Sequence, residues 1–189
     1  MTHLERLGPA PDSGRPRWKL VLLPLEGAIL KGLPAQLEAL LADPGSNRRV
    51  IDRLFPPSYA DPTEEREHRR LLGDGLLGER RDMLVEVRSL LAGTTPAGGA
   101  GGAAGVDAAA GASTAAPGLD LILEAGSLDL LLRFLNDVRL VLATDLGIEG
   151  NLSQAAALDP GDPDAPKQAL LEYLGGLEAI LVDAISREL

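Results

Sequence analysis

The chain has 189 residues, a net charge of −10 at pH 7 and no cysteine. This length fits one domain of ordinary size, and the lack of cysteine excludes disulfides, thiolate metal sites and cysteine nucleophiles. The acidic charge argues against non-specific nucleic-acid binding, which needs a basic surface. Leucine (38 residues) far outnumbers valine and isoleucine together (14), so the composition predicts a mainly α fold with an aliphatic core.

The first half of the chain is predicted to hold a tail, a strand and three helices. Residues 1–16 contain three prolines and two glycines without periodicity, which is typical of a flexible tail. Residues 17–23 alternate weakly and predict a short strand. Helices are predicted over residues 25–42, 47–55 and 61–91. We expect Pro34 to kink or break the first of them and the Gly73-Asp74 pair to break the third.

Residues 93–118 differ in composition from the rest of the chain. Of these 26 residues, 18 are glycine or alanine, and Asp107 is the only charged one. Such a segment cannot bury enough side chain to offset the entropic cost of ordering it. We therefore predict a flexible Gly/Ala-rich insertion at 93–118 that interrupts a single helical domain over residues 17–189.

The second half is organised around its most apolar segment, residues 127–148. On a helical wheel, the apolar side chains of this segment fill an arc of roughly 220°, so we expect a compact helical bundle around this central buried helix. Residues 119–123 alternate like a short strand and could pair with residues 17–23 in a small two-stranded sheet. The alternative is two extended arms packed separately. Residues 165–189 carry an apolar stripe and predict the last helix.

A polar cluster is expected near the core of this bundle, and its members are Arg53, Asn136, Asp137 and Arg139. The wheel places Arg139 inside the apolar arc, where a guanidinium must be paired or extend to water. Asn136 and Asp137 fall on the opposite, polar arc. We expect Arg53 to pair with Asp137, and Arg139 with Asp52 or Glu86. Three interpretations of Arg139 stay open: a structural ion pair that fixes helix register, a pocket arginine for a carboxylate or phosphate, and an ordinary surface arginine.

We predict no catalytic residue, metal site or cofactor. Glu65 and His68 have the Glu-x-x-His spacing of di-iron bundles, but those sites need a second copy and the only other histidine is His3. No nucleophile elbow and no phosphate-binding Gly-Lys-Ser/Thr motif occurs. An acid/base enzyme using Asp137 or Glu86 is a remaining alternative without a positive signal. No apolar run reaches the roughly 20 residues of a membrane span and no signal peptide is evident, so we expect a cytoplasmic protein.

Several stretches resemble an uncharacterised bacterial family, typical of actinobacteria and catalogued as domain of unknown function twenty-seventeen. They are DRLFPPSY at 52–59, the Glu/Arg run that ends in Arg69-Arg70, and LNDVRLVL at 135–142, with Tyr173-Leu174 and Leu177 similar to the closing segment. The resemblance covers residues 17–91 and 119–185 and implies no activity or catalytic residue. The resemblance does imply a genomic association, since members of the family are often encoded beside the ClpS-type adaptor of the Clp protease. Such an association does not indicate a mechanism.

These observations together predict a non-catalytic interaction or regulatory factor. We expect an unidentified protein partner, with a link to Clp-type regulated proteolysis suggested by the resemblance. We expect neither nucleic acid nor a membrane as a partner. The alternative is a small-molecule or anion-binding protein that uses Arg53 and Arg139. A homodimer formed through the last helix is also left open.

Overall fold

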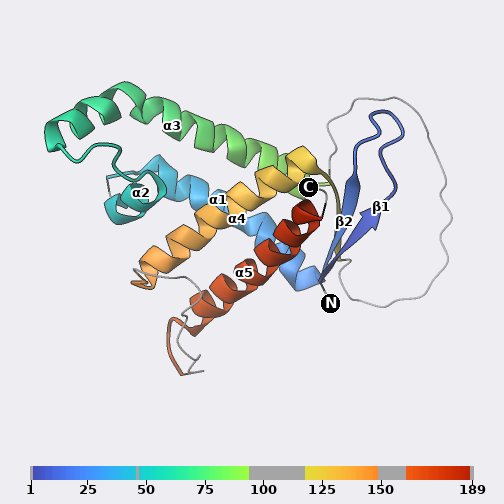
Figure 1. The fold of residues 1–189 in the computed structure, drawn as a ribbon. Helices are drawn as coiled ribbons and strands as arrows, with labels where there is room; N and C mark the ends of the chain where they lie inside the picture. The colour runs from blue at the N-terminus through green and yellow to red at the C-terminus, as the bar shows by residue number, and fades with distance from the viewer. Residues whose placement is uncertain (1, 46, 94–117, 149–160, 188–189) are drawn as a thin grey trace.

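The computed structural model describes residues 2–45, 47–93, 118–148 and 161–187 and is mainly helical (Figure 1). Its elements are β1 (His3–Leu7), β2 (Arg17–Leu22), α1 (Pro24–Ala42), α2 (Arg48–Leu54), α3 (Pro62–Leu91), β3 (Leu119–Glu124), α4 (Ala125–Asp145) and α5 (Ala165–Ser186). The prediction of a mainly α fold with a small sheet is confirmed. The predicted Gly/Ala-rich insertion lies outside the described residues, except for its two end glycines. No helix in the described ranges is long and apolar enough to span a membrane.

The sheet is antiparallel, with β2 between β1 and β3. The two strands expected from the sequence do pair, with Trp18 opposite Leu123 and Leu20 opposite Leu121. All four of these side chains are buried, because alternate residues of each strand face the helices. The polar alternates, such as Lys19 and Asp120, form an ion pair on the other face at 2.6 Å.

The N-terminal residues supply a third strand that the sequence did not predict. Residues 1–16 were expected to form a flexible tail, whereas His3–Leu7 pairs with β2 from His3↔Val21 to Leu7↔Arg17. This expectation is wrong for β1 because an edge strand whose side chains are largely exposed shows no clear hydrophobic alternation. Thr2, just before β1, also donates a hydrogen bond to Glu26 of α1.

Two helices are more continuous than expected. Helix α1 continues through Pro34, and α3 runs unbroken over 30 residues although a break was expected near Gly73. The Asp61 side chain caps α3 by accepting the backbone N–H groups of Thr63 (2.7 Å) and Glu64 (3.2 Å). A helical glycine costs only about 1 kcal/mol, which this cap and the packing of α3 on α1 and α4 offset.

Helix α4 contacts α2, α3, α5 and β3, and in Figure 1 it lies between α3 and α5. Its buried residues include Leu128, Leu131, Phe134, Leu135 and Val138. This pattern explains the wide apolar arc of the sequence, since each part of the arc meets a different neighbour. The helix thereby directs polar residues that are close in sequence towards different partners.

Candidate functional site

Two members of the predicted polar cluster, Asp137 and Arg139, form ion pairs with residues outside it. Asn136 is exposed on α4, and Arg53 lies half-buried on α2. Asp137 pairs with Arg80 of α3, not with Arg53, and Arg139 pairs with Glu178 of α5, not with Asp52 or Glu86. The predicted pairs are wrong because side chains two residues apart on an α-helix point in directions about 200° apart. Asp137 and Arg139 therefore face opposite neighbours.

Arg139 links α4 to α5. Its Nη1 donates a hydrogen bond to Glu178, and the two side chains are only 17% and 15% exposed. Gly175, one turn before Glu178, lies beside the guanidinium, and a Cβ there would make an ordinary van der Waals contact of 3.5 Å with Arg139 Nη2. Burial raises the pKa of Glu178, and the neighbouring Arg139 opposes that rise. The arginine that the wheel placed in the apolar arc is therefore one half of a largely buried ion pair between helices.

Asp137 is 2% exposed, so its expected place on a polar face is wrong. Arg80 of α3 covers it, with 3.2 Å between Arg80 Nε and Asp137 Oδ2. The same guanidinium lies over the Phe55 ring, 5.7 Å from its centroid. Burial raises the pKa of Asp137 to about 6, and Arg80 lowers it in part. The wheel could not foresee this, because Arg80 comes from a helix more than 50 residues earlier in the chain.

Asp137→Asn is expected to flatten part of the pH dependence of stability. A carboxyl whose folded pKa lies above its unfolded value of 3.8 stabilises the fold below pH 4, and this contribution is lost as the pH rises through about 6. The wild type should thus lose up to about 3 kcal/mol of unfolding free energy over this window relative to the variant. Urea titrations of both proteins at pH 4, 5, 6 and 7 measure the difference. If the free energy of unfolding changed with pH in parallel for the two proteins, a buried Asp137 that binds a proton in this range would be contradicted.

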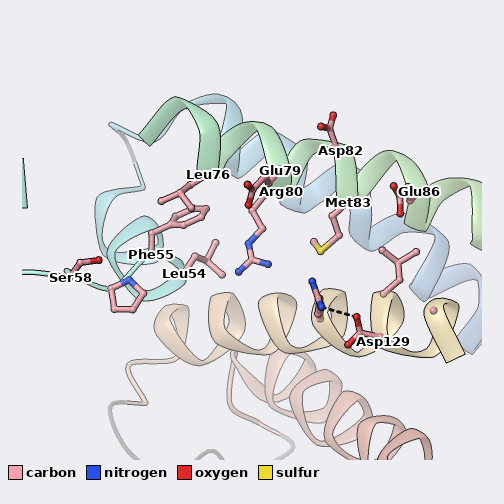
Figure 2. Close-up of a pocket in the computed structure, with 14 residues that line it drawn as sticks. Leu54, Phe55, Ser58, Leu76, Glu79, Arg80, Asp82, Met83, Glu86 and Asp129 are labelled. Carbon is pink, nitrogen blue, oxygen red and sulfur yellow. Dashed lines mark ion pairs between the residues drawn. The ribbon is translucent and has the colours of Figure 1, made fainter. Parts of the chain in front are cut away.

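A groove of about 710 Å³ opens between α3, α4 and the loop after α2 (Figure 2). Its apolar lining residues include Leu54, Phe55, Leu76, Met83 and Leu130. Its charged lining residues are Glu79, Arg80, Asp82, Glu86, Asp129 and Arg133. Met83 and Arg80 extend from α3 towards α4, while Leu76 and Phe55 lie at one end (Figure 2). The groove therefore combines apolar side chains with charged ones along a surface open to solvent.

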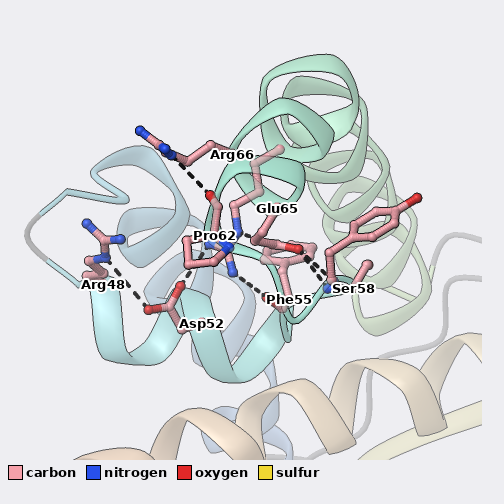
Figure 3. A network of polar contacts seen from close by, with 9 residues as sticks. Arg48, Asp52, Phe55, Ser58, Pro62, Glu65 and Arg66 are labelled. Atoms are coloured by element: carbon pink, nitrogen blue, oxygen red, sulfur yellow. Dashed lines mark hydrogen bonds and ion pairs between the residues drawn. The ribbon is translucent and has the colours of Figure 1, made fainter.

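An ion-pair network fixes the loop that closes this end of the groove (Figure 3). Arg69 contacts Asp52 (2.8 Å) and Glu65 (2.5 Å), and donates to the Phe55 carbonyl (3.2 Å). Glu65 in turn accepts the backbone N–H groups of Ser58 (2.8 Å) and Tyr59 (3.1 Å). These contacts join α2, the loop and α3, so the loop is held against the first turns of α3.

The same network includes Glu65, which is the glutamate of the Glu-x-x-His pattern formed with His68. The Glu65 carboxylate is occupied by Arg69 and two backbone N–H groups, and the His68 ring meets the Tyr59 ring edge-on at 5.2 Å between centroids. His68 also lines a smaller cavity of about 180 Å³ under the loop. Within the described ranges, no group of three or more histidine and carboxylate side chains is placed to hold a metal ion.

The groove was not predicted from the sequence, although one signal was present. Glu79, Met83 and Glu86 lie at i, i+4 and i+7 of α3 and therefore share one helix face. Met83 is buried (9% exposed) and Glu79 and Glu86 are exposed, so this face lies at the border between the core and solvent. Neither Arg53 nor Arg139 lines the groove or the smaller cavity.

The chain matches the model of a known protein family. A family model described as "Domain of unknown function (DUF2017)" matches residues 8–185. No curated protein and no solved structure matches the chain. The matched span includes every element that lines the groove.

Proposed function

The chain belongs to the DUF2017 family of domains of unknown function, and from the geometry of its groove we propose that it acts by binding a segment of another protein. The observation that carries this proposal is a solvent-open groove of about 710 Å³ with Phe55, Leu76, Met83 and Leu130 in its lining. Concave surfaces with apolar and aromatic side chains inside a polar rim are typical of protein-binding sites.

Exposed apolar side chains near the loop end of the groove support the same function. Leu76 is 38% exposed, and Leu71 (64%) and Tyr59 (46%) lie on α3 and on the adjoining loop. Leu76 also lines the groove, where an exposed apolar side chain is available for contact with a partner. Within the described part of the chain, no group of three or more histidine and carboxylate side chains is placed to hold a metal ion.

The cellular setting is part of the proposal. We look for the partner in the cytoplasm, in Clp-type regulated proteolysis, because the family resemblance implies a genomic association with the ClpS-type adaptor. Anion binding through Arg53 and Arg139 has weaker support, since Arg139 is paired with Glu178 and neither arginine lines either cavity. The acidic charge of the whole chain also disfavours anions as ligands.

Leu76→Glu is expected to reduce partner capture at least tenfold. The substitution puts a charge on an apolar contact of the groove, and truncating or replacing such a contact commonly costs a factor of this size. The measurement is affinity capture from native lysate with the full chain as bait, quantified by mass spectrometry. Thermal unfolding of the variant verifies that it is folded, as expected for a side chain that is 38% exposed.

Val182→Glu is the matched control, because Val182 is 50% exposed on α5 and does not line the groove. It should capture the same proteins as the wild type. Equal capture by Leu76→Glu would remove the groove from the binding surface. Capture of no protein above the empty resin would remove the support for an interaction function altogether.

A further inference from the structure

In the described part of the structure, the arginines that line the groove form ion pairs, whereas most of the carboxylates that line it do not. Both of its arginines are engaged: Arg80 with the buried Asp137, and Arg133 with Asp129 at 2.8 Å. Glu79, Asp82 and Glu86 line the groove from α3, and the described part of the structure contains no hydrogen bond or ion pair for them. The Asp82 carboxylate extends away from α4 (Figure 2), so the acidic wall consists of Glu79 and Glu86. Once the internal pairs are formed, the groove therefore presents a surplus of negative charge to its occupant.

The acidic groups flank the apolar ones in a regular order. Glu79 and Glu86 stand two turns apart on α3, and Met83 lies between them on the same face. Across the groove, Leu130 comes from α4 and Phe55 from the end of α2. An occupant that fits this order has apolar side chains along its centre and positive charges along one flank.

The length of the groove sets the size of the occupant. The α3 wall runs from Leu76 to Glu86, which corresponds to roughly 15 Å at 1.5 Å per residue. This length matches about three turns of an α-helix laid along the groove. An amphipathic helix docks in such grooves through residues at i, i+3, i+4 and i+7, and a helix of three turns supplies this set.

We propose that the groove binds a basic amphipathic helix of a partner protein, with apolar side chains between Phe55, Met83 and Leu130 and lysine or arginine side chains at Glu79 and Glu86. This inference rests on the proposed function and specifies its partner. A second copy of the same chain is a poorer occupant, because a protein of net charge −10 would bring further negative charge to an acidic wall.

The test uses the full chain and three fluorescein-labelled 14-residue helical peptides, measured by fluorescence anisotropy. All three carry leucine at positions 3, 6, 7 and 10, and their remaining helix faces are lysine-rich, glutamate-rich or glutamine-rich. We expect the lysine-rich peptide to bind best and to lose affinity as the salt concentration rises, since exposed charge pairs are screened. The double substitution Glu79→Gln/Glu86→Gln should weaken its binding at least fivefold.

Glu5→Gln/Glu172→Gln is the charge-matched control, because both residues are exposed and neither lines the groove. It should leave the affinity for the lysine-rich peptide within twofold of wild type. Loss of affinity in both double variants would show that only net charge attracts the peptide, and would overturn the proposed contacts.

The outcomes separate this inference from the function on which it rests. If the glutamine- or glutamate-rich peptide binds as tightly as the lysine-rich one and Leu76→Glu abolishes that binding, the groove is a protein site but its partner is not basic. If no peptide binds while Leu76→Glu still abolishes lysate capture, the helical occupant is wrong and the function stands. If sedimentation shows a dimer that Leu76→Glu dissociates, the occupant is a second copy.

Discussion

Phe134→Ala is expected to lower the free energy of unfolding by about 3–5 kcal/mol. Phe134 has the largest of the fully buried side chains, at 0% exposure, and it lies on the helix that contacts α2, α3, α5 and β3. Removing its ring leaves a cavity in the core that these elements share, and the rigid surroundings close it only in part. Because domains of this size have about 5–15 kcal/mol of stability, much of the margin would be lost. Urea denaturation followed by circular dichroism measures the change.

Two further variants of α4 serve as controls for this prediction. Phe134→Leu keeps most of the buried volume and should cost clearly less than alanine. Asn136→Ala, two residues along on an exposed position, should change the stability by no more than about 0.5 kcal/mol. Equal effects at Phe134 and Asn136 would contradict the assignment of the buried face of α4.

Glu178→Ala is expected to destabilise the fold by about 2–3 kcal/mol. The substitution leaves the Arg139 guanidinium largely buried without its carboxylate, and an uncompensated charge of this kind costs more than the pair contributes. Partial exposure of both side chains keeps the loss below that of a fully sealed pair. Chemical denaturation of the wild type and the variant at pH 7 gives the value.

The same two helices provide the control for the ion pair. Lys167 of α5 and Asp145 of α4 form a second pair at 2.5 Å, but their side chains are 43% and 54% exposed. Asp145→Asn should therefore cost less than about 1 kcal/mol. The double substitution Arg139→Met/Glu178→Leu should recover most of the loss, because it removes both charges together. If Glu178→Ala costs no more than Asp145→Asn, Arg139 has no structural role of this kind.

The elements that the sequence predicted correctly are those with strong local signals. The leucine pattern of α5 and the alternating residues of β2 and β3 each follow a helical or extended period, and the Pro56-Pro57 pair does end α2. Strand β1 was missed because its side chains are mostly exposed and its pairing depends on β2. The continuity of α3 was missed because local glycine propensity is weaker than capping and tertiary packing.

For the candidate polar cluster, the helical wheel placed Arg139 correctly and Asp137 incorrectly. The wheel correctly singled out Arg139 as a charge within an apolar arc, and the structure places a carboxylate against it. It misplaced Asp137, because a face that is polar in sequence becomes buried once Arg80 of α3 covers it. The partners of both residues, Arg80 and Glu178, lie far from them in sequence, and no local pattern identifies a contact at that distance.

By itself, the sequence determined the mainly helical class, the pairing segments of two strands, the apolar character of α4 and the membership of a family without an assigned activity. Only the tertiary structure decided which charges meet, which carboxyl is buried and where a groove opens. The physical reason is that secondary structure and amphipathicity depend on the spacing of residues that are only a few positions apart in the chain. Ion pairs, burial and the groove between α3 and α4 arise where helices distant in the chain pack together.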